Sequence, residues 1–289
     1  MPPGIFANQK HYKNMNTKYK CIVADLDGTL LRSDKSLSQK TKSVIEKLTD
    51  SGIEFVPATG RSFYSMPKEL LQIENINYAI TSNGVSIYDV KRQTAIFTSC
   101  LPKEFVSGAI ELLKDRVTFE CYIRGKTHIG AKDLENKLIC SEDPVRLAYL
   151  KQTRQPEKDI IQFMQSNINQ IEGIDISVEP CRKAEVLQLI KERLPEVYIT
   201  TSELNLLEIS NADCGKHRGL ERLCGMLNIS PEEVIAFGDN NNDIEMLKAA
   251  GLGLAVANAT EECKKAASRC IQSNDEDGVA SAIMAILKN

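Results

Sequence analysis

The chain has 289 residues, of which 42% are hydrophobic, so it can form one large or two ordinary globular domains. A formal net charge of −3 gives no broad basic surface, which argues against nucleic acid or an anionic membrane as the main partner. No apolar run reaches the roughly 18 residues that a membrane-spanning helix needs, so we expect no membrane association.

The nine cysteines are odd in number and scattered, without a Cys-x-x-Cys pair. This spacing is typical of free thiols in a reducing compartment, rather than of a disulfide framework or a zinc site. We therefore expect a cytoplasmic protein.

The first 18 residues mix Pro, Gly, Asn and Lys without hydrophobic periodicity, so residues 1–18 are predicted to be a disordered extension. They lack the apolar segment of a secretory signal, and no arginine precedes Arg32. Whether Met15 is an alternative start stays open.

The first predicted strand begins at Cys21 and stops on two carboxylates, Asp25 and Asp27, before Gly28 turns the chain. Ligands of open parallel sheets bind beyond the carboxyl ends of the strands, which would place both carboxylates at the mouth of a site. The alternative is an Asx-type turn, in which they bind only nearby backbone amides.

A helix is predicted over residues 39–51, followed by a second strand over residues 53–58 that ends on Thr59, Gly60 and Arg61. Strand, helix and strand in this order form a right-handed parallel unit, so Thr59 would reach the same sheet edge as the first carboxylates. Thr59 and Gly60 also suit the N-cap of a helix predicted over residues 66–71, and a threonine hydroxyl beside free amides can bind a phosphoryl group.

A third strand over residues 78–82 runs into Asn83 and Gly84, and residues 85–89 are again strand-like. Asn-Gly between two such runs predicts a hairpin, which would place Asn83 near the carboxyl edge of the sheet.

The pattern changes between about Ile87 and Ile209, where helices alternate with strands of mixed polarity. Polar and apolar residues alternate in residues 119–123 and 204–209, which favours an antiparallel sheet covered by helices on one face. We interpret this region as a second domain inserted into the first. Its predicted helices cover residues 103–115, 156–166 and 182–194, its further strands cover residues 117–123, 174–178 and 197–201, and residues 131–144 are predicted as a loop or short helix.

The chain then returns to the first domain with Lys216, at the start of a helix over residues 218–227. A lysine there opposes the helix macrodipole, whose positive end lies at the N-terminus, so a specific partner is expected. A further apolar strand over residues 234–238 runs into Asp239 and Asp243. A helix (244–250), a strand (251–256) and two more helices (261–268 and 278–287) complete the predicted elements.

Four carboxylates, those of Asp25, Asp27, Asp239 and Asp243, would converge at one sheet edge, where they repel one another unless a cation is bound. A ligand set made only of oxygens selects a hard divalent ion, and we expect Mg²⁺. A phosphoryl group attracted to that ion would be held by Thr59 and backbone amides, while Lys216 offsets the negative charge.

These stretches together resemble the four motifs of the haloacid dehalogenase-like superfamily, in the expected order. The runs Asp-Leu-Asp-Gly-Thr-Leu-Leu (25–31), Ala-Thr-Gly-Arg (58–61), Ser-Asn-Gly (82–84) and Gly-Asp-Asn-x-Asn-Asp (238–243) are similar to those of the Cof-type sugar-phosphate phosphatases. The resemblance implies an α/β fold: a doubly wound, Rossmann-like parallel-sheet core with an inserted α+β cap. The core would comprise residues 19–86 and 210–289, and the cap residues 87–209.

The resemblance also implies roles for individual residues. Asp25 would attack phosphorus and form an aspartyl-phosphate, and Asp27 would act as general acid and base while its backbone carbonyl touches the metal. Thr59 and Lys216 complete the implied catalytic set. The implied metal ligands are Asp25, Asp27, Asp239 and Asp243, and the implied substrate-binding residues are Gly60, Arg61, Asn83 and Asn242, with Asn258 nearby.

The implied activity is Mg²⁺-dependent hydrolysis of small phosphoesters, with sugar phosphates as the expected substrates, by a monomer or weak homodimer. A sugar phosphomutase of the same superfamily is one alternative, although residues after Asp239 lack the insertion of eukaryotic phosphomannomutases. A catalytically silent binding protein is another. Substrate identity depends on the cap, where Tyr122, Arg124, Lys126 and His128 are candidates for substrate contacts, or else form an exposed polar edge.

Overall fold

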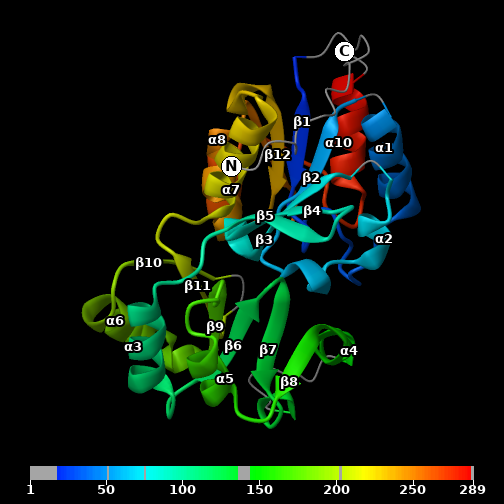
Figure 1. The fold of residues 1–289 in the computed structure, drawn as a ribbon. Helices are drawn as coiled ribbons and strands as arrows, with labels where there is room; N and C mark the ends of the chain where they lie inside the picture. Colours follow the sequence, from blue (N-terminus) through cyan, green and yellow to red (C-terminus); the bar gives the residue numbers. More distant parts are fainter. Residues whose placement is uncertain (1–17, 51, 75, 136–143, 202–203, 288–289) are drawn as a thin grey trace.

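The computed structural model of the protein describes residues 18–50, 52–74, 76–135, 144–201 and 204–287 (Figure 1). Residues 1–17, most of the predicted N-terminal extension, lie outside the described part. The core is a parallel sheet of five strands in the order β14-β13-β12-β1-β2. Its strands are β1 (Cys21–Ala24), β2 (Glu54–Pro57), β12 (Val234–Gly238), β13 (Leu252–Val256) and β14 (Arg269–Ile271).

The central strands β1 and β12 are buried at every position, because helices cover both faces of the sheet. In Figure 1, α7 and α8 lie on one side of these strands, and α1 and α10 lie on the other. This is the predicted doubly wound arrangement. The core helices are α1 (Gln39–Asp50), α2 (Lys68–Leu71), α7 (Lys216–Leu227), α8 (Ile244–Ala249), α9 (Glu261–Ala266) and α10 (Gly278–Leu287).

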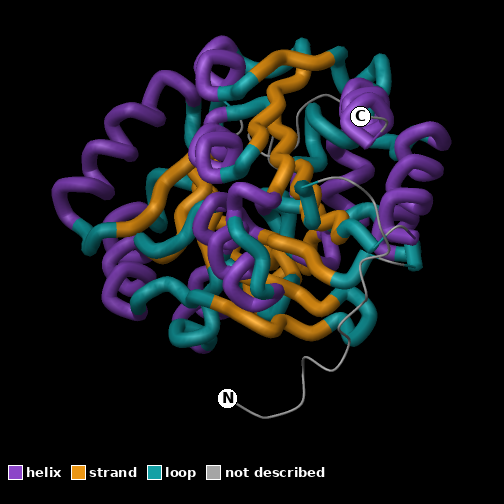
Figure 2. The backbone as a smooth tube through the Cα atoms, turned by 90° about the horizontal axis from the view of Figure 1, so that it is seen from above, coloured by secondary structure: helices purple, strands orange, loops and turns teal. Residues whose placement is uncertain are grey.

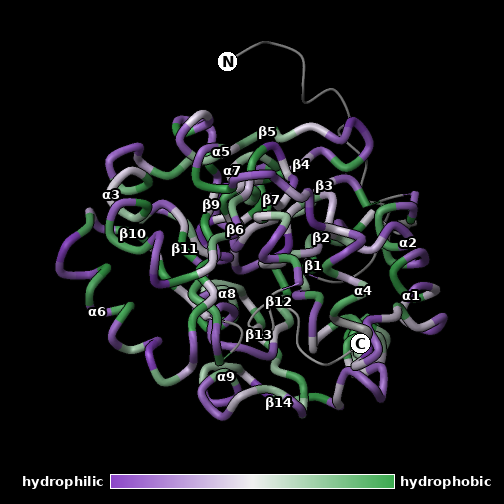
Figure 3. Tube along the Cα trace, turned by 90° about the horizontal axis from the view of Figure 1, so that it is seen from below, coloured by the Kyte–Doolittle hydropathy of each residue, from purple (hydrophilic) through white to green (hydrophobic). Residues whose placement is uncertain are grey.

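The outer helices are amphipathic, as α1 shows. Val44, Ile45 and Leu48 fall at helical spacing and are buried against the sheet, and the hydroxyl of Ser38 accepts a hydrogen bond from the amide of Thr41 at the helix start. Hydrophobic and hydrophilic stretches alternate along this helix in Figure 3. Seen from above in Figure 2, helices flank the strands on the left and right of the molecule.

The predicted Asn-Gly hairpin is confirmed. Strand β3 (Tyr78–Thr81) pairs antiparallel with β4 (Ser86–Asp89), which pairs with β5 (Thr94–Thr98), a strand that the sequence analysis did not predict. A parallel bridge between Ala58 and Ile80 joins this three-stranded sheet to the core. The end of β3 therefore lies beside the end of β2.

The inserted region contains a six-stranded sheet in the order β10-β11-β9-β6-β7-β8, in which all neighbours except β7 and β8 are antiparallel. Helices α3, α5 and α6 pack on one face, as predicted, in a second hydrophobic cluster. Its elements are α3 (Lys103–Leu113), β6 (Thr118–Ile123), β7 (Lys126–Gly130), α4 (Pro144–Thr153), β8 (Arg154–Glu157), α5 (Ile160–Ser166), β9 (Gly173–Ser177), α6 (Lys183–Arg193), β10 (Val197–Thr200) and β11 (Leu206–Asn211).

Two features of this region differ from the prediction. The expected helix start at Pro156 belongs instead to β8, and α5 begins after Asp159, whose carboxylate accepts a hydrogen bond from the Gln162 amide and caps the helix. Helix α4 was not predicted either. Residues 136–143 of the predicted loop lie outside the described residues.

The two hydrophobic clusters show with which domain β4 and β5 pack. Ile87, Tyr88 and Val90 belong to the hydrophobic cluster of the core, whereas the second cluster begins at Leu101 and ends at Ile209. The hairpin of β4 and β5 therefore packs with the core, and we propose that the cap begins after β5.

The chain crosses between the two domains twice, at residues 99–100 and 211–213, and these crossings are hydrogen bonded to each other. The hydroxyl of Ser99 donates to Asp213 Oδ1 over 3.0 Å, and the Asn211 side-chain amide donates to the carbonyl of Cys100 over 2.9 Å. Among the described residues, every helix is too short or too polar to span a bilayer.

Candidate active site

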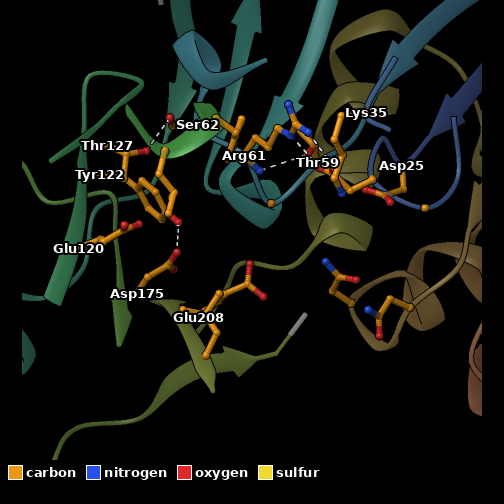
Figure 4. A pocket seen from close by; sticks show the side chains of 18 of the residues that line it. Asp25, Lys35, Thr59, Arg61, Ser62, Glu120, Tyr122, Thr127, Asp175 and Glu208 are labelled. Atoms are coloured by element: carbon orange, nitrogen blue, oxygen red, sulfur yellow. Dashed lines mark hydrogen bonds and ion pairs between the residues drawn. The ribbon is translucent and has the colours of Figure 1, made fainter. Parts of the chain in front are cut away.

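A cavity of about 520 Å³ lies between the carboxyl ends of the core strands and the cap face that α3, α5 and α6 leave uncovered (Figure 4). Side chains from both domains line it. Those from the core include Asp25, Asp27, Thr59, Arg61 and Asp239, and those from the cap include Glu120, Tyr122, Arg154, Asp175 and Glu208.

Three of the predicted carboxylates meet at the core end of this cavity. One oxygen from each of Asp25, Asp239 and Asp243 lies within 4.8 Å of the other two. They meet because β1 and β12 are neighbouring parallel strands, whose carboxyl ends share one edge. Gly28 permits the approach, since its φ is +83° and a Cβ there would lie 2.6 Å from Asp239 Oδ2.

Lys216, the first residue of α7, is the partner that its position at a helix start led us to expect. Its side chain is fully buried, and Nζ lies 2.6 Å from both Asp25 Oδ1 and Asp243 Oδ1. Burial alone would lower the pKa of this ammonium group, but the charges of Asp243 and Asp25 outweigh it and raise the pKa. Lys216 therefore stays charged between the two carboxylates.

Backbone and hydroxyl donors orient the other two carboxylates. Asp243 Oδ2 accepts hydrogen bonds from the amides of Asp239 and Asn240, over 3.0 and 3.1 Å. Thr29 donates its hydroxyl to Asp239 Oδ1 over 2.7 Å. The carboxylates are thus held in place before any ligand binds, which reduces the cost of ordering them around a cation.

The charge balance of the cluster fits a divalent cation. Burial raises the pKa of Asp25 well above its usual range, and Asp243 and Asp239 raise it further against the opposing charge of Lys216. Burial and Asp243 raise the pKa of Asp239 to about 6. One ammonium group thus does not balance three carboxylates, and their oxygen-only set suits Mg²⁺.

The carboxylate of Asp27 is directed elsewhere. Arg61 donates two hydrogen bonds of 2.6 Å to this carboxylate, and Lys35 Nζ lies 2.9 Å from its Oδ1. Although burial works in the opposite direction, these two cations lower the pKa of Asp27 to about 2. Asp27 is therefore ionised here, and its side chain does not belong to the three-carboxylate cluster.

The other predicted core residues surround the cluster. The Thr59 hydroxyl is buried and accepts a 3.1 Å hydrogen bond from the Arg61 amide, and Gly60 lines the cavity beside it. Asn242 also lines the cavity and donates its side-chain amide to Asn83 Oδ1 over 3.0 Å. Asn83 has a left-handed φ of 53° and in turn donates to Glu208 Oε1 of the cap over 3.2 Å.

Asn258 contacts the loop that follows β1. Its side-chain amide donates to the carbonyl of Gly28 over 2.7 Å, so it braces the loop after β1. It is not among the cavity-lining residues.

Of the four cap candidates, Tyr122 alone lines the cavity. A tight turn at Arg124 and Gly125 separates β6 from β7, so the four residues do not lie on one strand.

The other three candidates have partners away from the cavity. His128 pairs with Cys121, on the opposite face of the sheet from Tyr122, and its ring stacks on Phe163. Arg124 bonds Gln170, and Lys126 lies over Tyr64 of the core.

Several lining residues were not predicted, namely Lys35, Tyr149, Arg154 and the acidic residues of the cap. The Tyr149 ring, on α4, lies 4.7 Å from the Arg61 guanidinium and 5.2 Å from that of Arg154, so it links the cap to the core. The alternation around Glu120 and Tyr122 was a visible signal, but it did not reveal which strands are neighbours.

Comparison with known proteins agrees with this geometry. The family model of the haloacid dehalogenase-like hydrolases matches residues 22–283. The chain belongs to this family. The resemblance found in the four motifs is thereby confirmed, and the fold with its separate inserted sheet is that of the family's core and cap.

Its relatives in this family are phosphatases by name. A Haemophilus influenzae protein, named provisionally as a phosphatase, is 31% identical over 268 residues, covering 91% of this chain and 96% of its own. A 5-amino-6-(5-phospho-D-ribitylamino)uracil phosphatase of Bacillus subtilis is 30% identical over 283 residues, covering 93% and 98%. The crystal structure of a haloacid dehalogenase-like hydrolase from Bacteroides thetaiotaomicron is 28% identical, with a TM-score of 0.76 and coverage of 93% and 99%.

The chain is therefore a phosphatase of the haloacid dehalogenase-like family, a phosphoric monoester hydrolase that acts on small phosphorylated metabolites. Its three-carboxylate cluster is the family's type of metal site.

Proposed function

We propose that this phosphatase hydrolyses the phosphate esters of sugars or sugar alcohols through an aspartyl-phosphate on Asp25, with Mg²⁺ as cofactor. The observation that carries the proposal is the meeting of Asp25, Asp239 and Asp243 beside Lys216, at the core end of a cavity that the cap covers. The relatives named as ribitylaminouracil phosphatases act, by their names, on a phosphorylated sugar alcohol chain, which supports the same class here.

Asp25 would be the nucleophile. One of its oxygens forms a bond to phosphorus while the bond from phosphorus to the ester oxygen breaks, and water later cleaves the aspartyl-phosphate. Lys216 holds Asp25 Oδ1 and restricts the rotation of the carboxylate, so the other oxygen is presented to the substrate. Mg²⁺ bound by the three carboxylates would supply positive charge for the transferring phosphoryl group. Thr59 and the amides after β2 would hold its remaining oxygens.

Asp27 would protonate the departing ester oxygen and later take a proton from the attacking water. While Arg61 and Lys35 hold it, its pKa of about 2 keeps it ionised. An incoming phosphoryl group is an alternative anionic partner for Arg61. When the phosphoryl group binds, it would weaken the hydrogen bonds from Arg61 to Asp27 and so raise the pKa of Asp27. The acid would then be protonated when substrate is bound.

We further propose that the enzyme works in the cytoplasm, as a monomer or weak homodimer. All cysteines in the described part of the chain are free, which suits a reducing compartment. Its partner is the small phosphoester itself.

Phosphate release from a panel of phosphorylated metabolites, with Mg²⁺ and after chelation, tests this proposal. We expect chelation to abolish turnover and Asp25→Asn to lower it by at least about a thousandfold in a folded protein, because a neutral amide is a poor nucleophile. Asp34→Asn, at an exposed position outside the cavity, is the control. Turnover unaffected by chelation would remove the metal from the mechanism, and an active Asp25→Asn protein would place the nucleophile elsewhere.

A further inference from the structure

The cap wall of the cavity carries three acidic residues side by side. Glu120 on β6 and Glu208 on β11 both pair in register with Asp175 on the strand between them, β9. All three line the cavity, and each is at most 8% exposed. We call these three residues the carboxylate row. In Figure 4 the row and Asp25 lie on opposite sides of the cavity.

Such a row costs stability, because like charges directly opposite on neighbouring strands repel and because buried charges lose their hydration. Arg154 balances Glu120 with hydrogen bonds of 3.2 and 2.9 Å. Asp175 receives less: the Tyr122 hydroxyl donates to its Oδ2. Burial raises the pKa of Asp175, and the neighbouring acidic groups Glu208 and Glu120 raise it further.

One oxygen of Asp175 has no hydrogen-bond partner among the residues that the structure describes. Asp175 is only 4% exposed, and its buried Oδ1 accepts no hydrogen bond. Buried polar atoms are normally paired, so an orphaned acceptor in a cavity wall indicates that a donor arrives with the ligand. This observation is independent of the charge of the row.

The row does not have the geometry of a second metal site. Among the described residues, the three core aspartates are the only group of three acidic, histidine or cysteine side chains that lie close enough to share an ion. The missing donors are therefore expected from hydroxyl or ammonium groups, which need no such convergence. Among the described cap residues that line the cavity, the one cation, Arg154, is already paired with Glu120.

We propose that the carboxylate row is the leaving-group subsite: it binds a hydroxyl-rich leaving group that is uncharged or cationic, and it rejects a leaving group that carries its own carboxylate or second phosphate. This inference rests on the proposed phosphatase function and specifies its substrate class. Hydroxyls donate to the unpaired acceptor Asp175 Oδ1, whereas an additional anion would lie beside three buried acidic residues and be repelled.

The test compares two six-carbon esters that differ at one end, glucitol 6-phosphate with a hydroxymethyl group and 6-phosphogluconate with a carboxylate. Binding is measured by calorimetry in the Asp25→Asn protein with Mg²⁺, so that hydrolysis does not interfere. We expect the dissociation constant of glucitol 6-phosphate to be at least about tenfold lower than that of 6-phosphogluconate.

Adding Asp175→Asn to this protein should bring the two dissociation constants to within about threefold of each other, because the amide presents donors to the carboxylate. Glu208→Gln is the second variant, with the same expected direction, should Asp175→Asn fail to fold by its melting curve. Asp115→Asn, on an exposed turn of the cap outside the cavity, should leave the ratio unchanged.

Equal binding of the two esters in the Asp25→Asn protein, preference for 6-phosphogluconate, or a ratio that both row variants leave unchanged would overturn the inference. Failure of the proposed function looks different. In that case the wild-type enzyme releases no phosphate from any ester, while the Asp25→Asn protein still prefers glucitol 6-phosphate.

Discussion

Lys216 is the residue on which the charge balance of the core site depends. It is 1% exposed and lies between two buried carboxylates, at a helix start where the macrodipole disfavours a positive charge. The cost of burying it is offset only because Asp25 and Asp243 are both within 2.6 Å.

Replacing this lysine by methionine should therefore be strongly destabilising. Lys216→Met leaves two carboxylates buried without their cation, and we expect a loss of about 3–5 kcal/mol in the free energy of unfolding. Chemical denaturation with and without Mg²⁺ measures it. Added Mg²⁺ should recover more stability in the variant than in the wild type, since it replaces part of the missing charge. Equal recovery in both would show that Lys216 and the metal do not share the same carboxylates.

The raised pKa of Asp239 gives a prediction for pH. Its value is about 6 in the fold and 3.8 in an ordinary environment. Between these values the folded, metal-free protein binds more protons than the unfolded chain, so this group's contribution to stability falls as pH rises through about 6. A metal requires the ionised form. The rise in melting temperature caused by Mg²⁺ should therefore be larger at pH 7.5 than at pH 5.5, and Asp239→Asn should remove most of this difference. A rise independent of pH in the wild type would contradict the assignment.

At the scale of elements, the core was predictable because its signals are local. Strands β1 and β12 are continuous apolar runs that end on carboxylates, and α1 has helical spacing, so both types follow from a short window of sequence. The short strands β7 and β8 and the helix α4 lack such a signal. The residues of β7 and β8 are mostly polar, and these strands form because of their neighbours in the cap sheet, whereas α4 is only weakly amphipathic.

In the candidate site, too, some residues could be predicted from the sequence and others could not. The Asp25, Asp239 and Asp243 cluster could be predicted, since each residue follows a parallel strand. The direction of the Asp27 side chain could not, because Arg61 and Lys35 reach it from other segments. The carboxylate row could not either. Its members are far apart in sequence, and only the register of three strands brings them side by side.

Helix α5 offers a test of one local signal. Its N-cap, Asp159, accepts a 3.0 Å hydrogen bond from the Gln162 amide. Asp159→Ala should reduce the free energy of unfolding by about 1 kcal/mol, whereas Asp159→Asn should retain most of it. Chemical denaturation of both variants measures these free energies of unfolding. Phosphate release should stay at the wild-type level, because the N-terminus of α5 lies on the face of the cap sheet that is turned away from the cavity. A large loss of turnover would mean that α5 shapes the cavity.

At the scale of the molecule, the structure shows the cap in contact with the core. The hydroxyls of Ser62 and Thr127 lie 2.8 Å apart across the boundary, and the amide of Tyr64 donates to the carbonyl of Gly125. A cap that closes in this way excludes water from the phosphoryl group, and it must open for substrate to enter and product to leave.

Cross-linking this contact should stop turnover. In the double variant Ser62→Cys, Thr127→Cys, we expect oxidation to reduce phosphate release by at least about tenfold and a reductant to restore it, because opening limits access. Mass spectrometry verifies the cross-link, and the two single variants control for the free cysteines. A cross-linked protein with wild-type turnover would show that substrate reaches the site without cap movement.

The two crossings between core and cap, at residues 99–100 and 211–213, leave the core next to each other and are bonded together. The residues between them form one continuous stretch of the chain, so the whole cap is joined covalently to the core at one place. Exchange of this one stretch would therefore replace the cap wall of the cavity, while Asp25 before it and Lys216, Asp239 and Asp243 after it stay in place.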